Sequence, residues 1–272
     1  MLRAVKRGLV RIGCSVLSIL RGHRGVPVRI APGFWVAVHT SAYEDLRYWI
    51  RHEQATAVAL ARVWKPGICV VDIGAHHGAF SVCALRGGGH NIRLLSVEPS
   101  PQALAVLEAQ KSIHRNEQWT LHPVALMDTE GETTLEMGWS NMLVPDHSFH
   151  PGSPAHPVTV ATSTLDDLCR SENATPDLIK IDVEGLEGRV LAGAMRTLEA
   201  RPVIFLEWHR DMLQKQGIDP MAPLELLQQH DYRFEPYETP HVGTLDYIAL
   251  AQTATEPIVR LLCHPHPSPS RP

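Results

Sequence analysis

The sequence has few of the residues that stabilise small proteins through cross-links or bound zinc. Its 272 residues include five cysteines, an odd number that contains no CxxC pair. Disulfide frameworks and zinc sites depend on even or closely spaced sets of cysteines, so the sequence argues against both. We therefore expect a reducing, cytoplasmic setting.

Long apolar runs and early acidic residues are also lacking. The apolar run Ile12 to Leu20 is shorter than the roughly 20 residues that a membrane-spanning helix needs. Met1 to Tyr43 contains seven basic residues and no acidic one. Two interpretations stay open for residues 1–25: an amphipathic helix in peripheral contact with an anionic membrane, or a helix packed on the domain with its basic side exposed.

The usual sequence signs of nucleic-acid binding are missing. Subtracting the seven amino-terminal charges from the net charge of −4 leaves −11 for the rest of the chain. The basic arm has no interleaved aromatic residues, and no N/D-P-P-Y/F block follows the expected fourth strand. We expect no nucleic-acid partner.

The most informative motif that is present is ICVVDIGAHHGAF, from Ile68 to Phe80. It predicts a buried strand, a tight turn with Asp72 and Gly74 at the bend, and a helix that begins near Gly78. Glycine allows positive φ and close approach of a ligand, and the amides of a helix start face the same spot. A carboxylate at the bend repels phosphate and suits an ammonium group, so the turn favours a nucleoside joined to an amino acid.

A second carboxylate follows the next expected strand. Ile92 to Val97 is a short apolar run, and Glu98 comes directly after it, 20 residues beyond Gly78. In doubly wound folds a carboxylate at this spacing binds ribose hydroxyls. A helix cap explains either acidic residue alone, but the two in this order within a βαβ pattern favour cofactor binding.

Four segments carry a family resemblance. They are VVDIGAHHGAFS (Val70 to Ser81), SVEPSPQALAVLEAQ (Ser96 to Gln110), STLDDL (Ser163 to Leu168) and DLIKIDVEGLEGRVLAGA (Asp177 to Ala194). With FLEWH (Phe205 to His209), they make the chain similar to the FkbM family of class I methyltransferases, which use S-adenosylmethionine.

The resemblance implies a cofactor site and a class of acceptor. Asp72, Gly74, Gly78 and Glu98 match the family's cofactor segments, whereas His76 stands where the family usually has asparagine. In the family the segment HPVALMD lies beside the adenine, so Ala125 or Leu126 is expected to contact it, and an ordinary buried strand end is the alternative. The acceptor implied is a hydroxylated small molecule, a sugar, a glycolipid head group or a polyketide.

The expected fold is α/β, with a doubly wound, mostly parallel sheet and a carboxyl-terminal antiparallel strand pair. Apolar runs alternate with helical segments from Ile68 onward, which predicts a parallel sheet with right-handed crossovers. The closing pair is assigned to Tyr232–Glu235 and Leu245–Ala251. Gly138–Val158, rich in proline, histidine, serine and glycine, is expected to be a long mobile loop over the site.

Three divisions of the chain are expected. Residues 1–63 form an extension made of a basic helix, a hairpin (Val26–Ile30 with Phe34–Val38) and a helix from Tyr43 to Trp64. Residues 64–253 form the methyltransferase domain. Residues 254–272 form a disordered, proline-rich tail.

The candidate catalytic residues lie at two expected strand ends, in Asp182-Val183-Glu184 and Glu207-Trp208-His209. A base within reach of a hydroxyl acceptor accelerates methyl transfer, and Glu184 and His209 are the leading candidates. Asp182 either orients one of them or holds a divalent cation. Asp182, Glu184 and His209 resemble an oxygen and nitrogen set suited to magnesium or manganese, but no residue is assigned as a metal ligand. Capping of the next helix is the structural alternative for the DVEG segment.

The predicted function is S-adenosylmethionine-dependent O-methylation. A nicotinamide-dependent oxidoreductase is the first alternative, although the turn lacks G-x-G-x-x-G and no tyrosine is followed four residues later by lysine. A non-catalytic binding protein with the same fold is the second.

Overall fold

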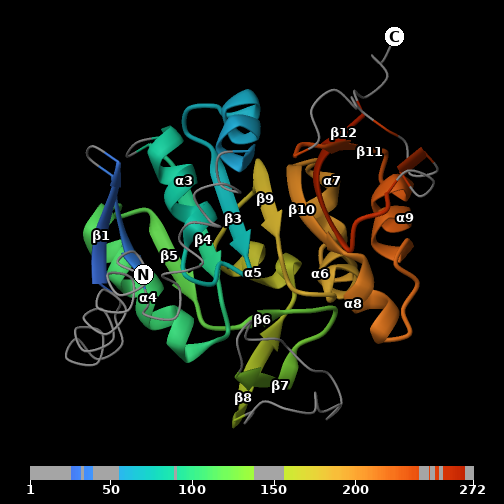
Figure 1. Ribbon diagram of the computed structural model, residues 1–272, viewed down its shortest axis with the longest axis horizontal. Helices are drawn as coiled ribbons and strands as arrows, with labels where there is room; N and C mark the ends of the chain where they lie inside the picture. Colours follow the sequence, from blue (N-terminus) through green and yellow to red (C-terminus); the bar gives the residue numbers. More distant parts are fainter. Residues whose placement is uncertain are drawn as a thin grey trace, which may run out of the picture.

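A seven-stranded sheet forms the centre of the molecule (Figure 1). The computed structural model describes residues 26–31, 34–38, 55–88, 91–137, 156–238, 245, 249–250 and 254–266. The strands run in the order β11-β12-β10-β9-β3-β4-β5. Their bounds are β3 (Cys69–Ile73), β4 (Arg93–Val97), β5 (Trp119–His122), β9 (Leu178–Ile181), β10 (Val203–His209), β11 (Tyr232–Pro236) and β12 (Ile258–Pro265).

The strand directions confirm the predicted doubly wound sheet. Strands β5, β4, β3, β9 and β10 are parallel to one another, and β12 pairs antiparallel with both β10 and β11. The chain runs outward from β3 through β4 to β5 and then returns to place β9 on the other side of β3. The carboxyl ends of β3 and β9 therefore form the switch point at which open α/β sheets bind ligands.

Helices cover both faces of the sheet. They are a helix at residues 55–63, α3 (Ala79–Gly88), α4 (Pro101–His114), α5 (Leu165–Ser171), α6 (Glu187–Ala192), α7 (Met195–Glu199), α8 (Arg210–Lys215) and α9 (Ala222–Gln229). Because successive strand residues point to opposite faces, Val70 joins one buried cluster with Leu60 and Phe80, while Val71 joins another with Leu191. The core is thus divided into two apolar layers, one on each face.

A small second sheet lies beside the main one, at the bottom of the view in Figure 1. It consists of β6 (Ala125–Leu126), β8 (His156–Ser163) and β7 (Gly131–Met137), in that order, with β7 and β8 antiparallel. The loop predicted over Gly138–Val158 is therefore too long at its end, because residues 156–158 already pair with β7. The remainder of that loop lies outside the described residues.

The closing antiparallel pair is confirmed in kind, but its second strand was assigned to the wrong segment. That strand is β12, which lies within the predicted disordered tail 254–272, whereas Leu245 forms only an isolated bridge with Phe234. Leu261, Leu262 and Cys263 of β12 are fully buried between β10 and β11. The sequence analysis missed this apolar segment because the prolines that follow it made the region look disordered. Residues 267–272 lie outside the described part.

The amino-terminal hairpin is confirmed as β1 (Val26–Ala31) and β2 (Phe34–Val38), which pair antiparallel. The predicted helix Tyr43–Trp64 is described at residues 55–63, and the basic segment 1–25 lies outside the described residues. None of the helices in the described ranges has the length and apolar character needed to cross a bilayer.

Candidate active site

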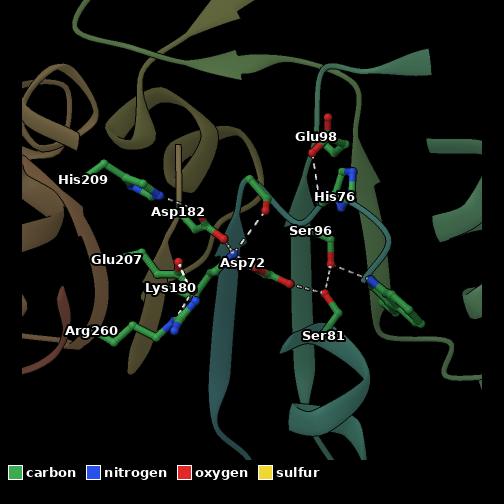
Figure 2. A network of polar contacts seen from close by, with 12 residues as sticks. Asp72, His76, Ser81, Ser96, Glu98, Lys180, Asp182, Glu207, His209 and Arg260 are labelled. Atoms are coloured by element: carbon green, nitrogen blue, oxygen red, sulfur yellow. Dashed lines mark hydrogen bonds and ion pairs between the residues drawn. The ribbon is translucent and has the colours of Figure 1, made fainter. Parts of the chain in front are cut away.

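The turn after β3 is held in a left-handed conformation. The φ angles of Gly74, His76 and Gly78 are 72°, 49° and 83°. The backbone N–H of His76 donates to Oε2 of Glu98 at 2.8 Å (Figure 2). The N–H of Ser100 donates to Oε1 of Glu98 at 2.8 Å. The end of β4 and the turn after β3 are therefore joined through Glu98, while its predicted contact with ribose stays a prediction.

The two glycines of this turn are required by the backbone conformation and packing of the protein itself. A Cβ atom at Gly74 would lie 1.8 Å from the carbonyl oxygen of Asp182, and one at Gly78 would lie 2.8 Å from Cδ2 of Leu107. The interpretation of these glycines as openings for a ligand is thus incomplete. Gly74 allows the ends of β3 and β9 to touch, and Gly78 allows α3 to begin against α4.

Asp72 lies beneath the turn and is fully buried. Ser81 donates from Oγ to Oδ2 of Asp72 at 2.5 Å, Ser96 lies 2.7 Å from Ser81, and Trp119 donates from Nε1 to Ser96 at 2.8 Å. Oδ1 of Asp72 accepts no hydrogen bond within the described residues, and burial raises the pKa of this carboxyl. One oxygen of Asp72 is therefore fixed by hydrogen bonding, and the other is a buried acceptor whose charged neighbour is the ammonium group of Lys180 at 3.7 Å.

Glu98 lies at the same end of the sheet as the turn. Its side chain is 5% exposed, and burial raises its pKa to about 7 although the N–H groups of Ser100 and His76 act in the opposite direction. The carboxylate oxygens have lone pairs beyond those that the two backbone donors use. Glu98 can therefore accept further hydrogen bonds once it is ionised.

Lys180 is a residue that the sequence analysis did not single out. Its Nζ donates to Oδ2 of Asp182 at 2.9 Å and to the carbonyl of Gly74 at 3.1 Å, and it lies 3.7 Å from Oδ1 of Asp72. Figure 2 shows it between Asp72 and Asp182. The signal was present in the sequence, since LIKI places a lysine inside an otherwise apolar strand.

Asp182, at the end of β9, is held ionised by its neighbours. Burial acts to raise its pKa, but the positive charges of Lys180 and His209 outweigh burial and bring the pKa below the ordinary range. Its Oδ1 lies 3.8 Å from Nε2 of His209. Asp182 is therefore an internal counter-ion and a poor proton acceptor.

Glu184 differs from the other carboxylates of the site. It is half-buried, has a left-handed φ of 55°, and accepts no hydrogen bond within the described residues. Burial raises its pKa to about 7, against the positive charge of His209. A carboxylate with this pKa is ionised in part near neutral pH and is a stronger base than an exposed glutamate.

His209, at the end of β10, is committed to a buried ion pair. Its Nδ1 lies 2.7 Å from Oε1 of Glu187, which also accepts from the N–H of Gly185 at 2.9 Å. Burial acts to lower the pKa of His209, but the hydrogen bond to Glu187 and the charge of Asp182 outweigh it and raise the pKa to about 9. As an imidazolium near neutral pH, His209 cannot accept a proton, so the geometry favours Glu184 among the predicted bases.

Three side chains of the site could act as metal ligands, but the cationic groups already bound to them leave no place for a divalent cation. Ligand atoms of Asp182, Glu207 and His209 lie within 4.8 Å of one another, so Glu207 takes the place that the sequence analysis gave to Glu184. Arg260 of β12 donates to both oxygens of Glu207, at 2.8 and 3.2 Å, and Lys180 already neutralises Asp182. A cation would have to displace the ammonium group of Lys180, the guanidinium group of Arg260 and a protonated imidazole.

Ala125 lies in β6 of the small second sheet. It pairs with Thr162 of β8, and its buried side chain packs with Leu135 and Val160. Contact of this residue with adenine stays a prediction.

Comparison with known proteins decides the family. The model of the Methyltransferase FkbM domain matches residues 72–234, which is more than half of the chain. The chain belongs to this family. It is therefore a methyltransferase with the class I fold that its strand order shows.

Individual relatives are more distant. The chain is 28% identical over 180 residues to the 2-O-methyltransferase NoeI of Sinorhizobium fredii, across 60% of this chain and 72% of that protein. A putative rRNA-methylase from Clostridium thermocellum aligns with 10% identity and a TM-score of 0.48, over 78% of this chain and 94% of the other. An O-methyltransferase from Bacillus cereus in complex with SAH aligns with 13% identity and a TM-score of 0.46, over 85% and 93%.

Proposed function

We propose that this FkbM-family protein transfers a methyl group from S-adenosylmethionine to a hydroxyl of a small molecule, a sugar or a glycolipid-type acceptor. The observation that carries the proposal is the position of Glu184. This carboxylate follows β9 at the switch point of the sheet, has a pKa of about 7, and accepts no hydrogen bond within the described residues. The name of the relative NoeI, a 2-O-methyltransferase, supports an oxygen acceptor.

The cofactor site is proposed at the turn after β3. Glu98 accepts hydrogen bonds from the two ribose hydroxyls, and the backbone of residues 74–78 lies along the amino-acid part. The buried Oδ1 of Asp72, which accepts no hydrogen bond from the described residues, fits a donor delivered by the ligand's amino group or by a water attached to it. Ala125 contributes backbone contact to the adenine. These residues match a nucleoside joined to an amino acid.

S-adenosylmethionine supplies an activated methyl group on a positively charged sulfur. The task left to the protein is to align the acceptor and to remove its proton. Glu184 takes the hydroxyl proton onto its carboxylate, a role worth roughly 10²- to 10⁴-fold in rate. Asp182 and His209 hold the segment that carries Glu184, Asp182 through Lys180 and His209 through Glu187.

Two alternatives predict different ligands. A nicotinamide-dependent oxidoreductase would bind NADH, and a non-catalytic protein of this fold would bind cofactor without turnover. Calorimetric titration of the purified chain with S-adenosylmethionine and with NADH separates the first alternative. We expect heat with S-adenosylmethionine only, lost in Glu98→Ala and kept in the surface control Glu117→Ala.

Turnover is tested by incubating the purified chain with cell extract and an isotopically labelled methyl donor. Mass spectrometry then finds the product that gains the label, and alkaline hydrolysis separates ethers from esters. A labelled ether that is lost with Glu184→Gln supports O-methylation of a hydroxyl. Binding of the cofactor without any labelled product would leave the non-catalytic alternative standing and overturn the proposal.

A further inference from the structure

Lys180 contacts both halves of the proposed site. It lies on β9, yet its ammonium group reaches the carbonyl of Gly74 at 3.1 Å and Oδ1 of Asp72 at 3.7 Å, both on the β3 side. On its own strand it donates to Asp182 at 2.9 Å. The residue is only 9% exposed, so these contacts are made away from water.

The backbone brings the same two segments together. Asp72 and Lys180 are register partners on the adjacent parallel strands β3 and β9. The N–H of Asp182 donates to the carbonyl of Ile73 at 3.1 Å, and Gly74 leaves room for the carbonyl of Asp182. The two turns are therefore in direct contact, so a displacement of one turn displaces the other.

Charge makes Lys180 necessary for this approach. Without it, the buried carboxylate of Asp72 and the partly exposed carboxylate of Asp182 would lie at neighbouring strand ends with no ammonium group between them, and like charges at short range repel. Arg260 is already bound to both oxygens of Glu207, so it is not free to replace the ammonium group.

Resting on the function proposed above, we propose that Lys180 is a positioning residue that ties the cofactor turn, residues 73–77, to the base-bearing turn, residues 182–186. Its three contacts hold the donor and Glu184 in one fixed geometry. Methyl transfer needs the nucleophile, the methyl carbon and the sulfur in line, so a fixed distance between these turns bears directly on rate. In this role the ammonium group supplies the positive charge between the two strand ends.

The test compares Lys180→Met with the double variant Lys180→Met/Asp182→Asn. The single variant leaves the carboxylates of Asp72 and Asp182 without the ammonium group between them and can fail to fold, whereas the double variant removes one of those two charges. Lys215→Met is the matched control, since Lys215 pairs with Asp211 at 3.0 Å on the surface with its side chain 65% exposed. Two quantities are measured: hydrogen exchange of both turns in the free protein, and the dissociation constant of S-adenosylmethionine.

In the double variant we expect at least about tenfold faster exchange in both turns and at least about tenfold weaker S-adenosylmethionine binding, a loss of about 1.4 kcal/mol. Exchange in α4 and α9 and all properties of Lys215→Met should match the parent. A purely structural role would instead raise exchange throughout the sheet. Exchange that rises only in residues 182–186, or binding within twofold of the parent, would overturn the proposal.

This experiment also distinguishes the two proposals. If the parent chain does not bind S-adenosylmethionine, the proposed function fails. The tie between the turns is then decided by hydrogen exchange of the free proteins alone.

Discussion

Nδ1 of His209 lies 2.7 Å from Oε1 of Glu187, and both side chains are buried at the carboxyl end of the sheet. This pair turns a histidine that looks like a catalytic base from its sequence position into a fixed positive charge. The charge then stabilises the ionised form of Asp182, and it is consistent with the proposal that Glu184 accepts the proton.

The His209 pair should stabilise the fold at low pH and lose that effect at high pH. The pKa of His209 is about 9 in the folded protein and about 6.5 when unfolded, so its contribution is fully present below pH 6.5 and disappears as the pH rises through 9. The maximum is about 3 kcal/mol. We expect urea unfolding to show that the parent exceeds His209→Gln in free energy of unfolding at pH 6, and that this difference is smaller by about 3 kcal/mol at pH 9.5. If this difference is the same at both pH values, or changes equally when the parent is compared with His230→Gln, the stabilising role of the His209–Glu187 pair is contradicted.

Glu184→Gln should remove proton acceptance and keep the cofactor site. We expect the rate of methyl transfer to fall by roughly 10²- to 10⁴-fold, with little change in S-adenosylmethionine affinity. The parent rate should drop about tenfold per unit as the pH falls below about 7, because Glu184 becomes protonated. The acceptor found by label transfer is the substrate, and Glu117→Gln is the surface control. Near-normal turnover in Glu184→Gln would remove Glu184 as the base.

Cofactor affinity should depend on the ionisation of Glu98. The pKa of Glu98 is about 7, and a carboxylate accepts hydrogen bonds from ribose hydroxyls best when ionised, so binding should weaken as the pH falls through 7. Glu98→Gln should lose about 1.5 to 3 kcal/mol of binding free energy and show no such pH dependence. Titration calorimetry at pH 6 and pH 8 measures both effects. Binding to Glu184→Gln should keep the parent's pH dependence. If that dependence is lost in Glu184→Gln, it arises from Glu184 and not from Glu98.

Turnover should not depend on added divalent cations. Lys180 and Arg260 already neutralise Asp182 and Glu207, and His209 is protonated near neutral pH, so the acidic group has no free ligand set. Dialysis against EDTA should leave the rate unchanged, and Mg²⁺ or Mn²⁺ should not raise it more than about twofold, which is under 0.5 kcal/mol of barrier. If EDTA abolishes activity and Mn²⁺ restores it, then a metal displaces the ion pairs that Lys180 and Arg260 form with Asp182 and Glu207.

The sequence predicted the parts of this fold that depend on local signals. Short apolar runs that end in a carboxylate identified β3 and β4 and placed Asp72 and Glu98 at one edge of the sheet. The same reasoning failed for β12, because its apolar residues Leu261 and Leu262 are followed by a proline-rich segment that dominates the local composition.

The roles of individual site residues were harder to predict, since they depend on partners far away in the chain. Lys180 bonds to Gly74 across 106 positions, and Arg260 bonds to Glu207 across 53. Sequence spacing gave no sign of either pairing. Without them the sequence did not distinguish Glu184 from His209 as the base, whereas their different partners give them different pKa values.

A crystal structure of the chain with S-adenosylhomocysteine tests the central claim most directly. We predict that both ribose hydroxyls lie within hydrogen-bond distance of Glu98, that the amino-acid end follows residues 74–78, and that the sulfur faces the side on which Glu184 lies. A ligand bound elsewhere, or with its ribose away from Glu98, would contradict this assignment.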